Sequence, residues 1–294
     1  MNVQDQDGTR FFVSAPDGLR LHVRAYGAPC QRRPVVCLPG LARTTDDFDA
    51  LAAALADHPE RPRYVLAVDY RGRGESEYDA NPDNYNIATE VADLLAVLTA
   101  LEVEPAVFVG TSRGGILAMV LATVRPAAIV GVVLNDIGPV IETKGLVRIK
   151  NYLGRLPQPK SLKDGADLLQ HLFGAQFTSL GADDWMMFAR RTFKQKKGAL
   201  VPRYDPKLAN VLAGIDMARS LPTLWKEFDA LASVPVMVIR GANSDILSER
   251  TVAEVQARRE DIDVVVVPEQ GHAPLLAERD VIARIAEFVA RCDV

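Results

Sequence analysis

Residues 106–117 read AVFVGTSRGGIL, and this stretch decides the fold. The apolar run 106–109 is typical of a buried strand, and an apolar helical pattern begins at Ser112. Between them, Gly110 and Gly114 permit a very tight turn, which would push the Ser112 hydroxyl out at the carboxyl end of the sheet. The simpler alternative is a serine that caps an ordinary strand-to-helix turn.

The rest of the chain alternates short β-branched runs with segments of helical period, which predicts an α/β fold with a mainly parallel sheet flanked by helices. The turn Ala15-Pro16-Asp17-Gly18 indicates that the first two strands form an antiparallel hairpin at the sheet edge. The eight expected strands are 11–13, 19–26, 35–38, 64–69, 106–109, 129–134, 236–240 and 264–267. The clearest expected helices are 87–101, 112–124 and 279–292.

The alternation breaks once, over the 98 residues from Asp136 to Ser233. Helical patterns occur there at 162–173, 182–193 and 208–213, but no convincing strand. We therefore expect a helical unit, residues 136–233, inserted into a core made of residues 1–135 and 234–294. The insertion carries 15 Lys and Arg against 10 Asp and Glu, whereas the remainder carries 19 against 28. A cationic insertion can dock on an anionic core, which we favour, or draw anionic substrates.

The composition excludes several classes of protein. With 294 residues, 48% hydrophobic, 24% charged and a net charge of −4, the chain is neither collagen-like, disordered nor histone-like. Three scattered cysteines argue against a metal cluster or a disulfide framework, so we expect no metal and no cofactor. The absence of a secretory signal, of a membrane-length apolar run and of extended basic runs predicts a cytoplasmic protein with a small-molecule substrate, no nucleic acid and no membrane.

A serine hydroxyl needs a neighbouring base to become a strong nucleophile, and only four histidines are available. His22 lies in an early strand, His58 in a loop and His171 in the insertion. His272 instead follows the strand 264–267, in a loop at the same carboxyl edge as Ser112. His272 is therefore the expected general base.

The base in turn needs an acid to orient it. Asp245 follows the strand 236–240 and fits the chain order serine, aspartate, histidine, so we expect Asp245 in this role. Asp136, directly after the strand 129–134, is a rival with the same topological position. Asp69 precedes the serine and is expected to hold its own turn.

Backbone N–H donors would have to stabilise the oxyanion that acyl transfer creates. The N–H of Arg113, directly after the serine, is one expected donor, and the N–H of Leu41 in Leu38-Pro39-Gly40-Leu41 is the other. The alternative for Pro39-Gly40 is a simple turn.

Together these motifs resemble the α/β-hydrolase fold superfamily over essentially the whole chain. The matching segments are Leu38-Pro39-Gly40-Leu41, the turn 69–76, the elbow at Ser112, the segment 240–245 and Gly271-His272-Ala273-Pro274. The resemblance implies a triad of Ser112, Asp245 and His272, oxyanion donors at Leu41 and Arg113, and a helical cap over residues 136–233. Members with an aspartate nucleophile are disfavoured because position 112 is serine.

Arg113 departs from the Met or Gln often found after the nucleophile in that superfamily. A cation in the first turn of a helix opposes the helix dipole, so we expect Arg113 to have a carboxylate partner, with Asp136 as a candidate.

The insertion is the expected source of substrate choice. Trp185, Met186 and Phe188 are candidate substrate-binding residues, although helix packing is the alternative for most of this apolar cluster. The expected reaction is hydrolysis of a carboxylic ester, or of a lactone or thioester, through an acyl-serine. C–C bond hydrolysis of a diketone, ligand sensing on a hydrolase scaffold and, more weakly, a structural role are the alternatives.

Overall fold

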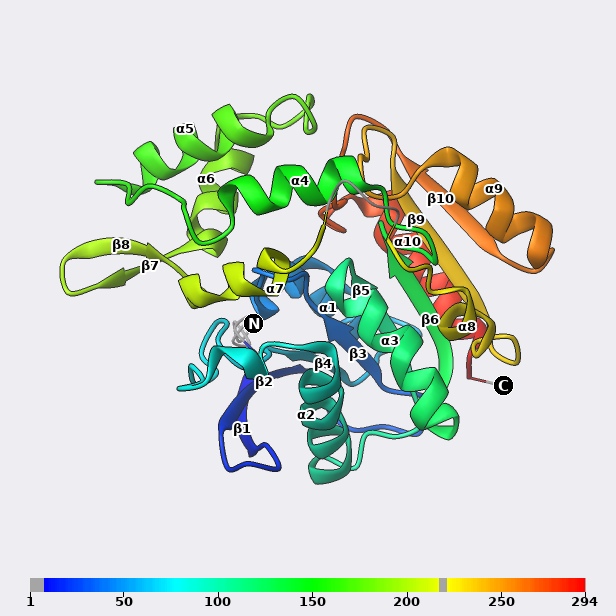
Figure 1. Ribbon diagram of the computed structural model, residues 1–294. Coiled ribbons are helices and arrows are strands. Elements are labelled where there is room, and N and C mark those ends of the chain that lie inside the picture. The colour runs from blue at the N-terminus through cyan, green and yellow to red at the C-terminus, as the bar shows by residue number, and fades with distance from the viewer. Residues whose placement is uncertain (1–7, 217–220, 294) are drawn as a thin grey trace.

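The computed structural model describes residues 8–216 and 221–293, and its centre is one eight-stranded sheet (Figure 1). The strand order is β1-β2-β4-β3-β5-β6-β9-β10, and only β2 runs antiparallel to its neighbours. The expected α/β class and the edge hairpin are confirmed. The strands are β1 (Thr9–Ser14), β2 (Arg20–Tyr26), β3 (Val35–Leu38), β4 (Val65–Val68), β5 (Ala106–Thr111), β6 (Ile129–Asn135), β9 (Val236–Gly241) and β10 (Asp263–Val267).

Helices cover both faces of this sheet (Figure 1). Successive side chains of a strand point to opposite faces, so in β5 Phe108 packs into one apolar cluster while Val107 and Val109 pack into the other. The first cluster includes residues of α2 (Ile87–Ala100), α3 (Arg113–Val124), α8 (Trp225–Asp229) and α9 (Glu249–Arg258); the second includes residues of α1 (Asp49–Ala56) and α10 (Arg279–Arg291). Within the described residues, no helix combines the length and apolar character that crossing a membrane requires.

The inserted segment, residues 136–233, leaves the sheet after β6 and returns at β9, and Figure 1 shows most of it over one end of the sheet. Residues 217–220 of this segment lie outside the described part. Besides α8, the described part of this segment contains α4 (Thr143–Tyr152), α5 (Leu162–Phe173), α6 (Ala182–Thr192), β7 (Phe193–Lys196), β8 (Ala199–Pro202), α7 (Asn210–Ala213) and the 3-10 helix η4 (Pro206–Ala209). Further 3-10 helices, in the core, are η1 (Thr45–Phe48), η2 (Pro82–Asn84) and η3 (Pro126–Ala128).

The expectation of no strand in the insertion is wrong, because β7 and β8 pair as an antiparallel hairpin. The sequence FKQKKGAL lacks the alternation of apolar residues that marks a strand. Lys197 and Gly198 both adopt positive φ, at 51° and 83°, and such two-residue turns connect hairpins. Turn geometry therefore produces this hairpin without a strand-like composition.

The turn between β5 and α3 holds Ser112 in a strained backbone conformation, with φ 51° and ψ −110°. A Cβ on Gly110 would lie 2.5 Å from the Gly114 carbonyl carbon, and a Cβ on Gly114 would lie 2.0 Å from the Leu38 carbonyl oxygen. Only glycine fits at either position, so the two glycines fix the close packing of α3 on the sheet that presents Ser112 at the strand end.

Substitution of Gly114 by alanine should destabilise the fold, because the new Cβ would collide with the backbone of β3. We expect Gly114→Ala to lower the free energy of unfolding by at least about 1–3 kcal/mol, as overpacking does. Gly214→Ala is the matched control, since a Cβ there meets nothing within 4 Å. Urea denaturation of both variants measures the difference; equal stability would contradict the packing described here.

Candidate functional site

Ser112 and His272 meet at the carboxyl end of the sheet. His272 Nε2 lies 2.8 Å from Ser112 Oγ. The loop that carries His272 is held against β6, because Asn135 Nδ2 donates to the Pro274 carbonyl at 2.9 Å. The structure therefore brings together the predicted nucleophile and base, which are separated by 160 positions in the chain.

The acid beside His272 is Asp136. Its Oδ2 lies 2.8 Å from His272 Nδ1, and the side chain is fully buried. Oδ1 accepts from the Gly241 N–H at 2.8 Å, and Oδ2 also accepts from Ser244 Oγ at 2.5 Å. Because a carboxylate only accepts hydrogen bonds, His272 donates from Nδ1, which leaves Nε2 of the neutral ring free to accept from Ser112.

The prediction that Asp245 orients His272 is contradicted by these contacts. Asp245 instead forms a bidentate ion pair with Arg148 of α4, at 2.7 and 2.8 Å. Burial favours a raised pKa for Asp245, but the hydrogen bonds and charge of Arg148 outweigh it and lower the pKa of this carboxyl. Its neighbour Ser244 makes the contact with Asp136. Asp245 therefore joins the inserted segment to the core.

The expected carboxylate partner of Arg113 exists, but it is Glu90 of α2 rather than Asp136. Arg113 Nε donates to Glu90 Oε2 at 2.7 Å, and Arg73 forms a second ion pair with Oε1 at 2.8 Å. Arg73 Nε also donates to the Leu41 carbonyl at 2.8 Å. One buried carboxylate thus connects the residue after Ser112 to the loop of Leu41.

The two expected oxyanion donors are placed consistently with that role. Arg113 is the first residue of α3, so its N–H has no acceptor within the helix. Leu41 lines the same cavity as Ser112, and Gly40 approaches the serine closely: a Cβ on Gly40 would lie 4.0 Å from Ser112 Cβ. Their participation stays a prediction.

Asp69 holds the turn that follows β4, as expected. Its carboxylate accepts from the backbone N–H groups of Thr45 and Glu75, at 2.8 and 3.2 Å, and lies 2.8 Å from His22 Nδ1. The pair of Asp69 and His22 is buried, is not part of the lining of the cavity at Ser112, and organises loops of the core.

A cavity of about 210 Å³ opens beside Ser112 and His272, beneath the inserted segment. Phe188 lines it, as predicted, but Trp185 and Met186 do not. Trp185 is 2% exposed and packs among the aromatic side chains of the insertion, so its role is helix packing. Met187, which was not among the predicted binding residues, contributes to the wall instead. Other apolar lining residues include Ile149, Leu156, Leu169, Phe173 and Phe177.

Comparison with known proteins decides the family. Residues 35–285 match the family model described as alpha/beta hydrolase family. The chain belongs to this family. The expected resemblance is thereby confirmed, and the protein is a hydrolase.

Relatives of this hydrolase include esterases and other hydrolases. A 3-hydroxybutyrate-oligomer hydrolase from Cupriavidus necator is 33% identical over 287 residues, which cover 93% of this chain and 94% of the relative. A 2-(acetamidomethylene)succinate hydrolase from Mesorhizobium japonicum is 27% identical over 79% of each chain. The crystal structure of an alpha/beta hydrolase from Novosphingobium aromaticivorans superposes with a TM-score of 0.89 at 36% identity, over 98% of this chain and all of that one.

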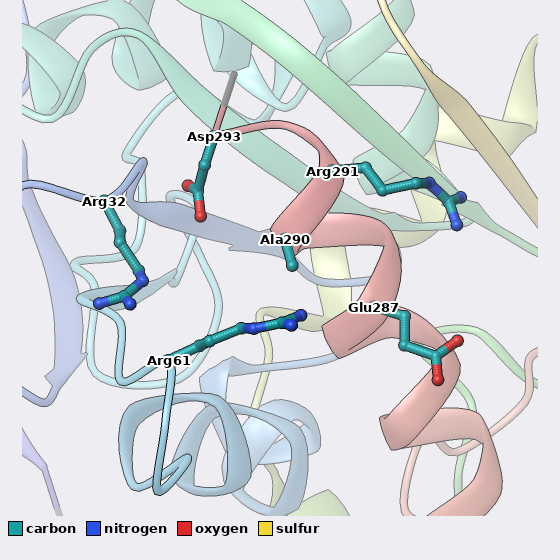
Figure 2. A pocket seen from close by; sticks show the side chains of 6 residues that line it. All are labelled: Arg32, Arg61, Glu287, Ala290, Arg291 and Asp293. Carbon is teal, nitrogen blue, oxygen red and sulfur yellow. The ribbon is translucent and has the colours of Figure 1, made fainter.

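A second hollow, of about 440 Å³, lies beside the residues that precede strands β3 and β4, and Figure 2 shows the side chains that line it. Arg32 precedes β3 and Arg61 precedes β4, so both lie at the amino ends of parallel strands. The remaining lining residues belong to the end of α10 and the residues after it: Glu287, Ala290, Arg291 and Asp293. None of these lining side chains is a serine, cysteine or histidine, so this hollow lacks a pair of residues like Ser112 and His272.

Glu90 balances two buried guanidinium groups, and its removal should be costly. The two arginines lower the pKa of Glu90, although burial alone would raise it. The ionised Glu90 therefore stabilises the fold above its unfolded-state pKa, and this stabilisation is lost as the pH falls through its folded-state pKa. We expect Glu90→Gln to lower the free energy of unfolding by about 3–5 kcal/mol at neutral pH. The difference in the free energy of unfolding between the parent and Glu90→Gln should shrink below about pH 4.

Glu287→Gln, which changes an exposed carboxylate of α10, serves as the control and should stay within about 0.5 kcal/mol of the parent. Chemical denaturation at several pH values provides the measurement. A Glu90→Gln variant as stable as this control at neutral pH would contradict the proposed balance of charges.

Proposed function

We propose that the protein hydrolyses a carboxylic ester through an acyl-enzyme on Ser112. The observation that carries this proposal is the continuous chain of contacts from Ser112 Oγ to His272 and from His272 to the buried carboxylate of Asp136, each 2.8 Å long. A serine, a base within hydrogen-bond reach and an acid that orients the base are the parts that nucleophilic acyl transfer requires.

In this mechanism Ser112 Oγ attacks the ester carbonyl carbon while His272 Nε2 takes the hydroxyl proton. Asp136 stabilises the resulting imidazolium without taking its proton. The N–H groups of Leu41 and Arg113 donate to the carbonyl oxygen as it becomes negative. Collapse of the tetrahedral intermediate expels the alcohol, which receives the proton from His272.

Water resolves the acyl-enzyme by the same route in reverse. His272 takes a proton from the water as it attacks the acyl carbon, and returns it to Ser112 Oγ when the carboxylic acid leaves. Because the cavity lies beneath the inserted segment, we propose that residues 136–233 act as a cap over this reaction.

The cavity supports a small substrate with apolar parts. Its volume of about 210 Å³ is below the roughly 300–1,000 Å³ of pockets for drug-sized ligands. The relative from Cupriavidus necator is named as a hydrolase of 3-hydroxybutyrate oligomers. Such oligomers are short chains of hydroxy acids joined by ester bonds. We therefore propose a short ester of a hydroxy acid as substrate. Lactones and thioesters are further candidates, because the same acyl-enzyme route would cleave them.

Fluorophosphonate labelling tests the nucleophile. We expect one label per chain, located on Ser112 by peptide mass spectrometry and absent from Ser112→Ala. Ester turnover by Ser112→Ala should fall by on the order of 10⁶-fold in kcat.

Undiminished turnover in that variant would refute the proposal. If the parent enzyme turns over only the diketone in a panel of esters, lactones and diketones, the activity is C–C bond hydrolysis. Ligand-induced thermal stabilisation without any turnover would indicate a sensing module.

The choice of acid is tested by a matched pair of isosteric variants. Asp136→Asn should reduce kcat for an ester by about 10³- to 10⁴-fold, because an amide no longer stabilises the imidazolium and favours the wrong tautomer. Asp245→Asn should retain kcat within about tenfold, since its carboxylate contacts Arg148 rather than His272. Steady-state kinetics on both variants decides, and a loss of turnover confined to Asp245→Asn would restore the assignment of Asp245.

A further inference from the structure

Four charged side chains line the cavity beside Ser112: Arg43, Asp47, Asp184 and Arg191. Three of them already have partners. Arg43 donates to both carboxylate oxygens of Asp47, at 2.7 and 2.5 Å. Asp184 accepts from the Gly181 N–H at 2.9 Å and so caps the start of α6.

Arg191 differs from the other three. Its Nε is buried, and no hydrogen-bond partner for it exists among residues 8–216 and 221–293. Burial raises the pKa of Asp49, and Arg191 is one of the cations that oppose this rise. However, Asp49 accepts hydrogen bonds from Tyr26 and Arg24, at 2.6 and 3.0 Å, and within residues 8–216 and 221–293 its ion pair is with Arg24 rather than with Arg191.

Arg191 lines the cavity from the end of α6. Arg191 stands in the last turn of α6, where the helix dipole favours a cation. The next residue, Thr192, accepts a hydrogen bond from Arg43 at 2.8 Å, which fixes this end of α6 against the loop that begins beside Ser112. Arg43 in turn stacks on Phe188, 4.6 Å from the ring centroid, so the surrounding wall is fixed.

We propose that Arg191 binds a carboxylate of the substrate, so that the enzyme selects esters that carry a free acid group. This inference rests on the proposed ester hydrolysis. A buried guanidinium N–H without an acceptor, such as Nε of Arg191, is costly, and a carboxylate that enters the cavity with the substrate can supply the acceptor. The planar guanidinium presents parallel N–H groups whose spacing matches the two oxygens of a carboxylate.

Competition assays test the proposal with a matched pair of ligands. The reporter is hydrolysis of neutral p-nitrophenyl acetate, and the competitors are the linear 3-hydroxybutyrate dimer and the same dimer with its terminal carboxylate converted into an amide. We expect Arg191→Gln to change the ratio of the two competition constants by about tenfold to a hundredfold, through weaker binding of the acid. Arg191→Lys should recover part of this ratio, because it keeps the charge but not the planar geometry.

Arg190→Gln is the control, since Arg190 is the exposed neighbour on α6 and does not line the cavity. It should leave the ratio unchanged. A ratio that is the same in the parent and in Arg191→Gln would overturn the assignment of Arg191. Full reporter turnover in Ser112→Ala would instead overturn the proposed function, whatever the ratio, so the two failures are distinguishable.

Discussion

The buried carboxylate of Asp136 is the contact on which the site depends. It lies directly after β6 and accepts hydrogen bonds from the N–H of Gly241, the last residue of β9, from Ser244 Oγ after β9 and from His272 after β10. A single side chain therefore joins the loops that follow three neighbouring parallel strands. Because a buried carboxylate needs such donors, the interactions that satisfy Asp136 also fix the imidazole toward Ser112.

A second buried carboxylate, Glu90, organises the other half of the site. Its ion pairs with Arg73 and Arg113 connect the Leu41 loop to the first turn of α3, where Ser112 is presented. Both expected oxyanion donors are therefore positioned through one charge cluster beneath them. This arrangement also accounts for a cation at the start of a helix, a position that the helix dipole alone disfavours.

Local patterns in the sequence predict the sheet, the elbow at Ser112 and the base His272, because strand alternation and glycine spacing are local signals. They do not separate Asp136 from Asp245, since both follow adjacent parallel strands and both fit the order serine, aspartate, histidine. Two contacts between residues far apart in the sequence distinguish them: Asp136 with His272, across 136 positions, and Asp245 with Arg148, across 97. The sequence does contain a local indication of the role of Glu90. Together with Asp93, Glu90 lies on the buried face of α2, where an acid is rare unless it is paired with a cation.

Proton NMR of the His272 imidazole tests whether Asp136 holds this ring. A proton shared between Nδ1 and a buried carboxylate should give a strongly downfield resonance. We predict that this resonance persists in Asp245→Asn and disappears in Asp136→Asn. Its loss in Asp245→Asn, with retention in Asp136→Asn, would show that Asp245 rather than Asp136 holds the histidine.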